Sequence, residues 1–149
     1  MADKPRIVVK GDKDLIKKLK RLGDRGKLRR VLRRATNASA QVIVRSVRNF
    51  WPVDTGLSKR SVTKKVIRTK GGYSAIIGVD SNASAEAEGH THVPSNIDHL
   101  VEFGWQTHSG LTVPAVAPLR RGHEAAKSDA DATFARKAAE DIEKAATGK

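Results

Sequence analysis

The sequence predicts an α+β fold with two N-terminal helices, a small antiparallel β-sheet with a hairpin, and a long C-terminal helix. Three observations lead to this prediction. Apolar residues recur at helical spacing before residue 50 and again after residue 119. Two β-rich runs flank the turn-forming residues Lys70-Gly71-Gly72. The length of 149 residues suits one core, so residues 1–149 are expected to form a single domain.

The N-terminal residues are predicted to form a strand followed by a helix. Residues 6–10 are mostly β-branched and end at Gly11, as expected of a short strand. Asp12 or Asp14 can then cap a first helix, which Gly23 ends.

The strongest periodic pattern in the sequence predicts a second helix from about Gly26 to Phe50. Its apolar positions are Leu28, Val31, Leu32, Ala35, Ser39, Val42, Ile43, Ser46 and Phe50. At about 100° per residue, five basic residues point away from this stripe. They form a predicted basic ridge of Lys27, Arg30, Arg34, Arg45 and Arg48. Pro52 closes the helix, because the residue before a proline is disfavoured in the helical region.

The middle of the chain is predicted to contain the hairpin and a loop. Residues 57–61 could begin a strand or form a short helix. Residues 62–69 and 73–79 are the two strands of the hairpin. Residues 81–96 are small and polar and are expected to be a long mobile loop.

The last third of the chain is predicted to be mainly helical. A short helix over residues 97–103 would bury Leu100, Val101 and Phe103. A second loop, which contains two prolines, leads into the C-terminal helix at about residues 119–147. Small residues on one face of that helix would allow close approach to a neighbouring element.

The net charge of +13 is unevenly distributed along the chain. Residues 1–70 contain 22 Lys and Arg against 5 Asp and Glu, and residues 71–149 contain 7 against 11. Such a basic half calls for a polyanion or an acidic protein surface, which includes the C-terminal half of a neighbouring copy. With only six aromatic residues, base stacking is disfavoured, so contacts with nucleic acid should be to phosphates.

The absence of cysteine excludes a disulfide framework and thiolate metal sites. The sequence has neither an apolar signal core nor an apolar run of the ~20 residues needed to cross a bilayer. We therefore expect a soluble protein without membrane contacts, made in the cytoplasm.

One alternative starts from Asp54-Thr55-Gly56, the triplet in which aspartic proteases carry a catalytic carboxylate, and from the later Ile76-Ile77-Gly78. That chemistry needs the aspartate on a loop between two apolar strands. Here a basic helix precedes the triplet, bulky Leu57 follows it, and only 21 residues separate Gly56 from Gly78. The context favours a turn in which Asp54 bonds backbone amides and Gly56 takes a positive φ. No catalytic residue is predicted.

A second alternative is a metal site formed by histidines. His90 and His92, followed by Asp98 and His99 with Glu88 nearby, contain suitable ligand types. Five residues separate His92 from Asp98, and the segment offers no flanking strand to fix the ligands. Solvated loop histidines are the favoured interpretation, and neither a metal nor a cofactor is predicted.

Three segments taken together resemble the gp10-like minor structural proteins of tailed bacteriophages, known as neck, head-tail connector or tail-completion proteins. The segments are Pro52-Val53-Asp54-Thr55-Gly56-Leu57, then His99-Leu100-Val101-Glu102-Phe103-Gly104, then Val113-Pro114-Ala115-Val116-Ala117-Pro118-Leu119-Arg120. The resemblance in order and spacing covers residues 25 to about 145. It implies a structural turn motif, Pro52, Asp54, Thr55 and Gly56, and an assembly-loop motif, Glu102, Phe103, Gly104, Pro114, Pro118 and Arg120.

The resemblance also implies a function and partners. It implies a virion protein of the neck or tail that forms a ring, with six copies expected, at the joint between head and tail. The implied partners are further copies of the chain, head-closure or adaptor proteins, and tail-terminator or tail-tube proteins. Genomic double-stranded DNA would pass through the ring and make nonspecific contacts with the basic ridge. The alternative from a different class is a small basic protein that binds DNA without sequence preference.

Overall fold

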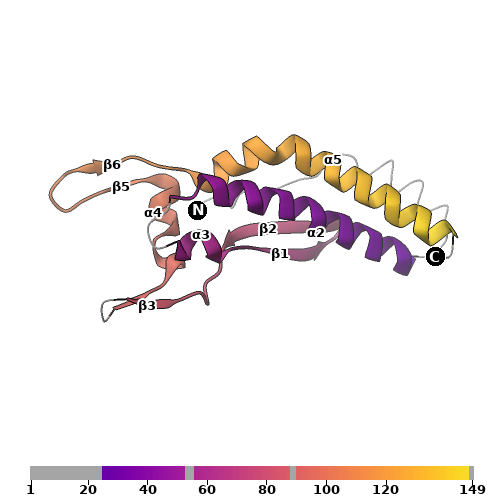
Figure 1. The fold of residues 1–149 in the computed structure, drawn as a ribbon, viewed down its shortest axis with the longest axis horizontal. Coiled ribbons are helices and arrows are strands. Elements are labelled where there is room, and N and C mark those ends of the chain that lie inside the picture. Colours follow the sequence, from indigo (N-terminus) through magenta and orange to yellow (C-terminus); the bar gives the residue numbers. More distant parts are fainter. Residues whose placement is uncertain (1–24, 53–55, 88–89, 148–149) are drawn as a thin grey trace. The chain divides into compact units, whose positions relative to one another are not determined.

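The computed structural model describes residues 25–52, 56–87 and 90–147 (Figure 1). The helices are α2 (Arg25–Phe50), α3 (Leu57–Ser61), α4 (Asp98–Phe103) and α5 (Pro118–Thr147), with one turn of 3-10 helix, η1 (Pro94–Asn96). The strands are β1 (Val62–Thr69), β2 (Gly72–Val79), β3 (Ala85–Ala87), β4 (His90–His92), β5 (Trp105–Gln106) and β6 (Thr112–Val113). The α+β prediction is confirmed, including the hairpin and the long C-terminal helix. The strand expected at residues 6–10 and the first helix lie outside the described residues.

The strands described form three separate two-stranded sheets, β1–β2, β3–β4 and β5–β6. The β3–β4 and β5–β6 pairs are antiparallel, with Glu86 opposite Thr91 and Trp105 opposite Val113. Residues 57–61, for which the sequence left two possibilities, form the short helix α3.

The chain divides into two compact units. Among the described residues, the first unit contains residues 25–42, 65–76 and 127–147. The second contains residues 43–52, 56–64, 77–87 and 90–126. Helix α2, the β1–β2 hairpin and α5 each contribute to both units. That residues 1–149 act as a single domain stays a prediction.

The core of the first unit is formed by α2 and α5, with a contribution from β2. Val31, Leu32 and Ala35 of α2 form a buried cluster with Phe134 and Ala138 of α5. Leu28, Tyr73 and Ile142 pack against this cluster. The apolar stripes that the sequence predicts on both helices therefore meet in this core, and α5 runs alongside α2 (Figure 1).

The core of the second unit contains a close backbone approach between the same two helices. Val47 of α2 is buried, and a Cβ atom added at Gly122 of α5 would lie 2.4 Å from the Val47 Cα atom. A side chain as small as alanine therefore needs a shift of the backbone at this point. The small residues predicted to allow close approach are present, with Gly122 at the nearest position.

Helix α4 confirms the helix predicted for residues 97–103, but its buried face differs from the predicted one. Phe103 is 66% exposed, so its predicted burial is wrong, whereas Glu102 is only 7% exposed. Leu100 and Val101 are half-buried. The cause is a tertiary interaction described below, in which the Glu102 carboxylate receives two backbone hydrogen bonds.

Residues 81–96 differ from the loop that the sequence predicts, because they contain the β3–β4 ladder and η1. The strands lack the apolar alternation that identifies a half-buried strand. Backbone pairing over three residue pairs forms the ladder instead.

No helix in the described ranges combines the length and apolar character needed to cross a bilayer.

We predict that Gly122→Ala lowers the stability of the protein. Overpacking of a well-packed contact costs about 1–3 kcal/mol, which the roughly 1 kcal/mol gain in helix propensity offsets only in part. The midpoint of denaturant-induced unfolding should therefore decrease. Gly78→Ala is the matched control, since a Cβ atom there meets nothing within 4 Å. Equal midpoints for the two variants would contradict the close approach of α2 and α5.

Candidate nucleic-acid interface

The exposed face of the first half of α2 is strongly basic. Arg29, Arg30, Arg33 and Arg34 are all exposed, and we call these four residues the arginine quartet. Their spacing forms two pairs four residues apart, Arg29 with Arg33 and Arg30 with Arg34, which places neighbouring Cβ atoms about 5–6 Å apart. Lys27 is also exposed beside them.

The buried residues of α2 explain why the line of the helix through Arg29 and Arg33 has no exposed basic residue after Arg33. Two turns after Arg33, this line continues through Ala40, Val44 and Val47. Those three later residues are buried. Along this line, α2 therefore changes from exposed arginine to buried apolar residues. The arginine quartet lies wholly in the first unit.

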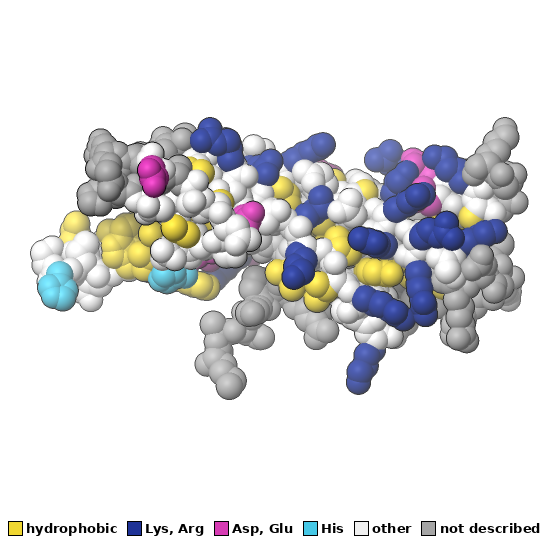
Figure 2. Space-filling model, turned by 90° about the horizontal axis from the view of Figure 1, so that it is seen from below, with side chains coloured by type: hydrophobic (Ala, Val, Ile, Leu, Met, Phe, Trp, Pro, Cys, Tyr) yellow, Lys and Arg dark blue, Asp and Glu magenta, His cyan; other side chains and the backbone are white. Residues whose placement is uncertain are grey.

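The described parts of the segment from α2 to the end of the hairpin contain many basic residues and no acidic ones. Residues 25–52 and 56–79 include 14 Lys and Arg and no Asp or Glu. Lys65, Arg68 and Lys70 of the hairpin are exposed, like the arginine quartet. Figure 2 shows one face of the molecule on which Lys and Arg side chains gather in the right half and outnumber the acidic ones.

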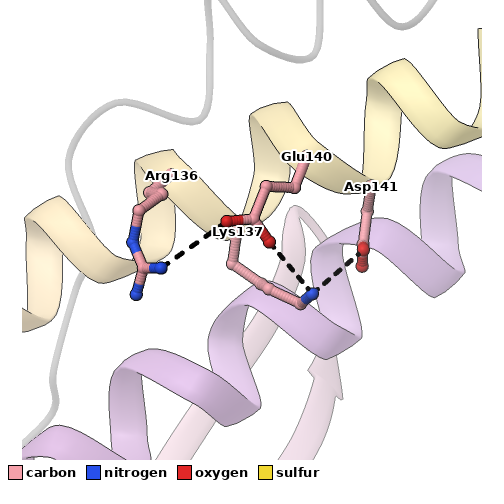
Figure 3. Close-up of polar contacts among 4 residues, drawn as sticks. All are labelled: Arg136, Lys137, Glu140 and Asp141. Carbon is pink, nitrogen blue, oxygen red and sulfur yellow. Dashed lines mark hydrogen bonds and ion pairs between the residues drawn. The ribbon is translucent and has the colours of Figure 1, made fainter.

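A group of ion pairs lies on α5. Lys137 contacts Glu140 and Asp141, each at 3.3 Å, and Arg136 contacts Glu140 at 3.5 Å (Figure 3). The hydrogen bonds from Lys137, first to Asp141 and then to Glu140, raise the pKa of the lysine. The carboxylates of Glu140 and Asp141 are thus paired within α5. No ion pair among the described residues involves the arginine quartet.

The structure corrects the prediction that Arg48 belongs to the basic ridge. Its guanidinium donates hydrogen bonds from Nη2 to the carbonyl oxygens of Val62 (2.8 Å) and Arg60 (3.3 Å). These carbonyls lie at the C-terminal end of α3, where a cation is favoured by the helix dipole. Arg48 is half-buried, and its Nε is fully buried without a hydrogen-bond partner among the described residues. Partial burial, together with the nearby Arg48 charge, lowers the pKa of Lys64 in β1.

Of the five predicted ridge residues, Lys27, Arg30, Arg34 and Arg45 are exposed. The sequence analysis missed Arg29 and Arg33, which the same helical periodicity places beside them. The helical periodicity could have identified Arg29 and Arg33 as exposed, because neither residue falls on the apolar stripe.

The assembly-loop motif divides into internal and exposed residues. Glu102 Oε2 accepts a hydrogen bond from the backbone N–H of Leu119 (2.9 Å), and Oε1 accepts one from Arg120 (3.2 Å). These amides lie in the first turn of α5, where Pro118 is buried at the first position. The first N–H groups of a helix lack acceptors within the helix. The Glu102 carboxylate of α4 accepts from two of them and so caps the start of α5.

Gly104 fixes the chain direction after α4. Its φ is +75°, and an added Cβ atom would lie 2.6 Å from the Val113 carbonyl oxygen and 2.8 Å from the Ala115 nitrogen. Only glycine satisfies both requirements without strain. By contrast, Phe103, Pro114 and Arg120 of the same motif are exposed.

The turn motif is described only at its ends. Gly56 has a φ of +74°, which confirms the positive φ predicted for it. Its carbonyl oxygen accepts a hydrogen bond from the Arg60 N–H (3.1 Å), and Gly56 is the N-cap of α3. Pro52 is exposed, and α2 ends at Phe50 as predicted. Asp54 and Thr55 lie outside the described residues.

The histidine cluster forms no metal site within the part of the chain that the structure describes. No group of three or more His, Cys, Asp or Glu residues there is placed to hold an ion. His99 Nδ1 lies 3.8 Å from the carboxylate of its neighbour Asp98.

We predict that Arg48→Ala destabilises the protein by about 2 kcal/mol, because hydrogen bonds from a charged group contribute roughly 1.5–3 kcal/mol. Arg45→Ala, at an exposed position of the same helix, removes the same charge and should change stability by less than about 0.5 kcal/mol. Urea unfolding of both variants gives the comparison. If Arg45→Ala were as destabilising as Arg48→Ala, the capping role of Arg48 would be refuted.

We also predict that Glu102→Ala destabilises the protein by about 2 kcal/mol, since it leaves two amides at the start of α5 without their acceptor. Glu102→Gln should lose less, because one side-chain oxygen remains to accept. Glu124→Ala on the exposed face of α5 is the control for the charge change. The stabilities are compared by thermal unfolding. An equal decrease in the melting temperature of Glu124→Ala and Glu102→Ala would argue against the capping role of Glu102.

A comparison with known protein families gives one match. The family model described as "Bacteriophage HK97-gp10, putative tail-component" matches residues 13–104, which is more than half of the chain. No curated protein and no solved structure gives a significant match.

Proposed function

Because this chain belongs to the HK97-gp10-like family of bacteriophage tail components, we propose that it forms a ring at the head-tail joint of a tailed phage. In this proposal it is a neck, connector or tail-completion protein with a structural role and no catalytic one. Six copies are the expected number. The observation that supports the proposal is the arginine quartet, a basic surface on α2 that would border the DNA passage.

The electrostatics of α2 support a polyanionic partner. Four guanidinium groups are exposed within six consecutive residues, and the described residues 25–79 contain no carboxylate to neutralise them. The mutual repulsion of like charges is relieved when phosphates approach and release their counterions. Contacts between arginine side chains and phosphate oxygens hold a protein on the duplex without reading the base sequence. Such contacts suit a passage through which any part of a genome must travel.

The assembly-loop motif supports the second half of the proposal, which concerns protein partners. Glu102, Gly104 and Pro118 fix the local structure between α4 and α5, and this leaves Phe103, Pro114 and Arg120 exposed. These exposed residues are the proposed contacts with other copies, with head-closure or adaptor proteins, and with tail-terminator or tail-tube proteins.

The same basic surface suits a small DNA-binding protein that acts alone, and the two functions separate experimentally. A solitary DNA-binding protein binds duplex DNA as a monomer or dimer and is absent from virions. A ring component is present in purified virions at a fixed low copy number.

We predict that Arg30→Glu and Arg34→Glu, each introduced into the phage genome, reduce the yield of particles that retain DNA. Each reversal places a carboxylate where the proposal places a phosphate, so repulsion replaces attraction. The measurements are the titre of infectious particles and the fraction of filled heads in electron micrographs.

The control for these variants is Lys127→Glu, an exposed reversal on α5 with the same change of net charge. It should leave DNA retention near the wild-type level. For the purified protein, Arg30→Ala should decrease the slope of log K against log salt for duplex DNA by about one. Wild-type DNA retention in both Arg30→Glu and Arg34→Glu phages would refute the proposed role of the arginine quartet.

A further inference from the structure

The end of α4 and the β5–β6 hairpin expose several large apolar side chains. Among the described residues five large apolar side chains are exposed, and three of them lie in this region: Phe103, Trp105 and Leu111. A fourth, Ile97, is the N-cap of α4. Phe103 and Leu111 are each 66% exposed, and Trp105 is 40% exposed. We call residues 103–113 the arm. Apolar patches of this kind on a water-exposed surface mark sites of interaction.

The arm is held firmly by its own hydrogen bonds. At its base, the N–H groups of Val116 and Ala117 donate to the Val101 carbonyl oxygen, at 3.0 and 3.2 Å. At its tip, the Thr107 hydroxyl accepts from the Leu111 N–H (3.0 Å), and the Thr107 N–H donates to the Leu111 carbonyl (2.8 Å). The apolar side chains are therefore presented on a pre-formed hairpin, which lowers the entropy cost of binding.

The arm also contains no Lys, Arg, Asp or Glu. Residues 103–119 contain no Lys, Arg, Asp or Glu, and this run of 17 residues is the longest of its kind in the sequence. Depletion of charge and enrichment of aromatic residues are typical of the centre of a protein interface. Two copies of a chain with a net charge of +13 repel each other, but the arm can approach another copy without adding a charge to that repulsion.

Exposed residues of complementary chemistry occur on the β1–β2 hairpin. The fifth exposed apolar side chain, Ile76, is 50% exposed in β2. Lys65, Arg68 and Lys70 are exposed in the same hairpin, which contains no carboxylate. Cationic groups are attracted to the faces of aromatic rings such as Phe103 and Trp105. The hairpin thus offers an apolar contact for Leu111 and cations for the two rings.

We infer that the arm of one copy docks on the β1–β2 hairpin of the next copy, where Phe103, Trp105 and Leu111 cover Ile76. The donor and acceptor are different surfaces of the same chain, so the contact runs head to tail. Repetition of such a contact closes into a ring when the rotation between copies permits. The inference rests on the ring of the proposed function and identifies the surfaces that join its copies. It leaves the arginine quartet for DNA.

Cysteine cross-linking tests this inference directly, because the chain contains no cysteine of its own. Leu111→Cys and Ile76→Cys proteins are purified separately at full length, mixed and oxidised. The inference predicts a disulfide-linked heterodimer in the mixture, little product from either protein alone, and a ladder of multimers from the double variant. The control is a double variant in which Ala132→Cys, at an exposed position of α5, replaces Ile76→Cys. This control should give no ladder.

A charge-swap pair gives a second measurement that does not depend on oxidation. Leu111→Lys should weaken self-association about tenfold in analytical ultracentrifugation, because it places a cation against the basic hairpin. Adding Arg68→Glu to that variant should restore association, since the two new charges then attract.

The outcomes separate this inference from the proposed function. Cross-linking of Leu111→Cys to itself would show an arm-to-arm contact and overturn the inference. Failure of the mixture to cross-link would overturn it as well, even if the protein forms rings in virions. Absence of the protein from virions would instead overturn the proposed function.

Discussion

The positive charge of α2 and the β1–β2 hairpin is the constraint on which the rest of the account depends. The described residues between Arg25 and Val79 include 14 basic side chains and no carboxylate. On α5, by contrast, Lys137 pairs with Glu140 and Asp141, and Arg136 pairs with Glu140. A surface of this kind is stabilised by an external anion, and its repulsion also limits where two copies can meet.

The buried acidic side chains have internal roles. The Glu102 carboxylate caps the first turn of α5 through two backbone amides, and Asp141 pairs with Lys137 within α5. The raised pKa of Lys137 means that this pair stabilises the fold below the ordinary lysine pKa, and the stabilisation is lost as the pH rises through the raised value. Arg48 likewise serves the fold by bonding the carbonyls at the end of α3. The exposed surfaces include a basic face on α2 and the arm, which contains no Lys, Arg, Asp or Glu, and these two surfaces suit different partners.

Sequence periodicity predicted most of the fold because α2 and α5 are long and regularly patterned. It also predicted the hairpin, where the turn residues Lys70-Gly71-Gly72 separate two β-rich runs. The pattern failed where a tertiary contact overrode local preference. The pattern predicted that Phe103 is buried. Instead, the Glu102 carboxylate is buried where it accepts hydrogen bonds from two backbone amides of α5, and the Phe103 ring is exposed. Arg48 was assigned to the basic ridge for a similar reason, since helical spacing cannot reveal carbonyls that lie 12 and 14 residues along the chain. The β3–β4 ladder is short and lacks apolar alternation, so no periodic signal identified it.

Electron cryo-microscopy of the intact, DNA-filled phage tests the central claim most directly, at a resolution that shows α2 side chains. The account predicts that this chain lies at the head-tail joint with Arg30 and Arg34 facing the DNA passage. A particle in which the arginine quartet faces solvent, or is covered by an acidic protein surface away from DNA, would contradict it.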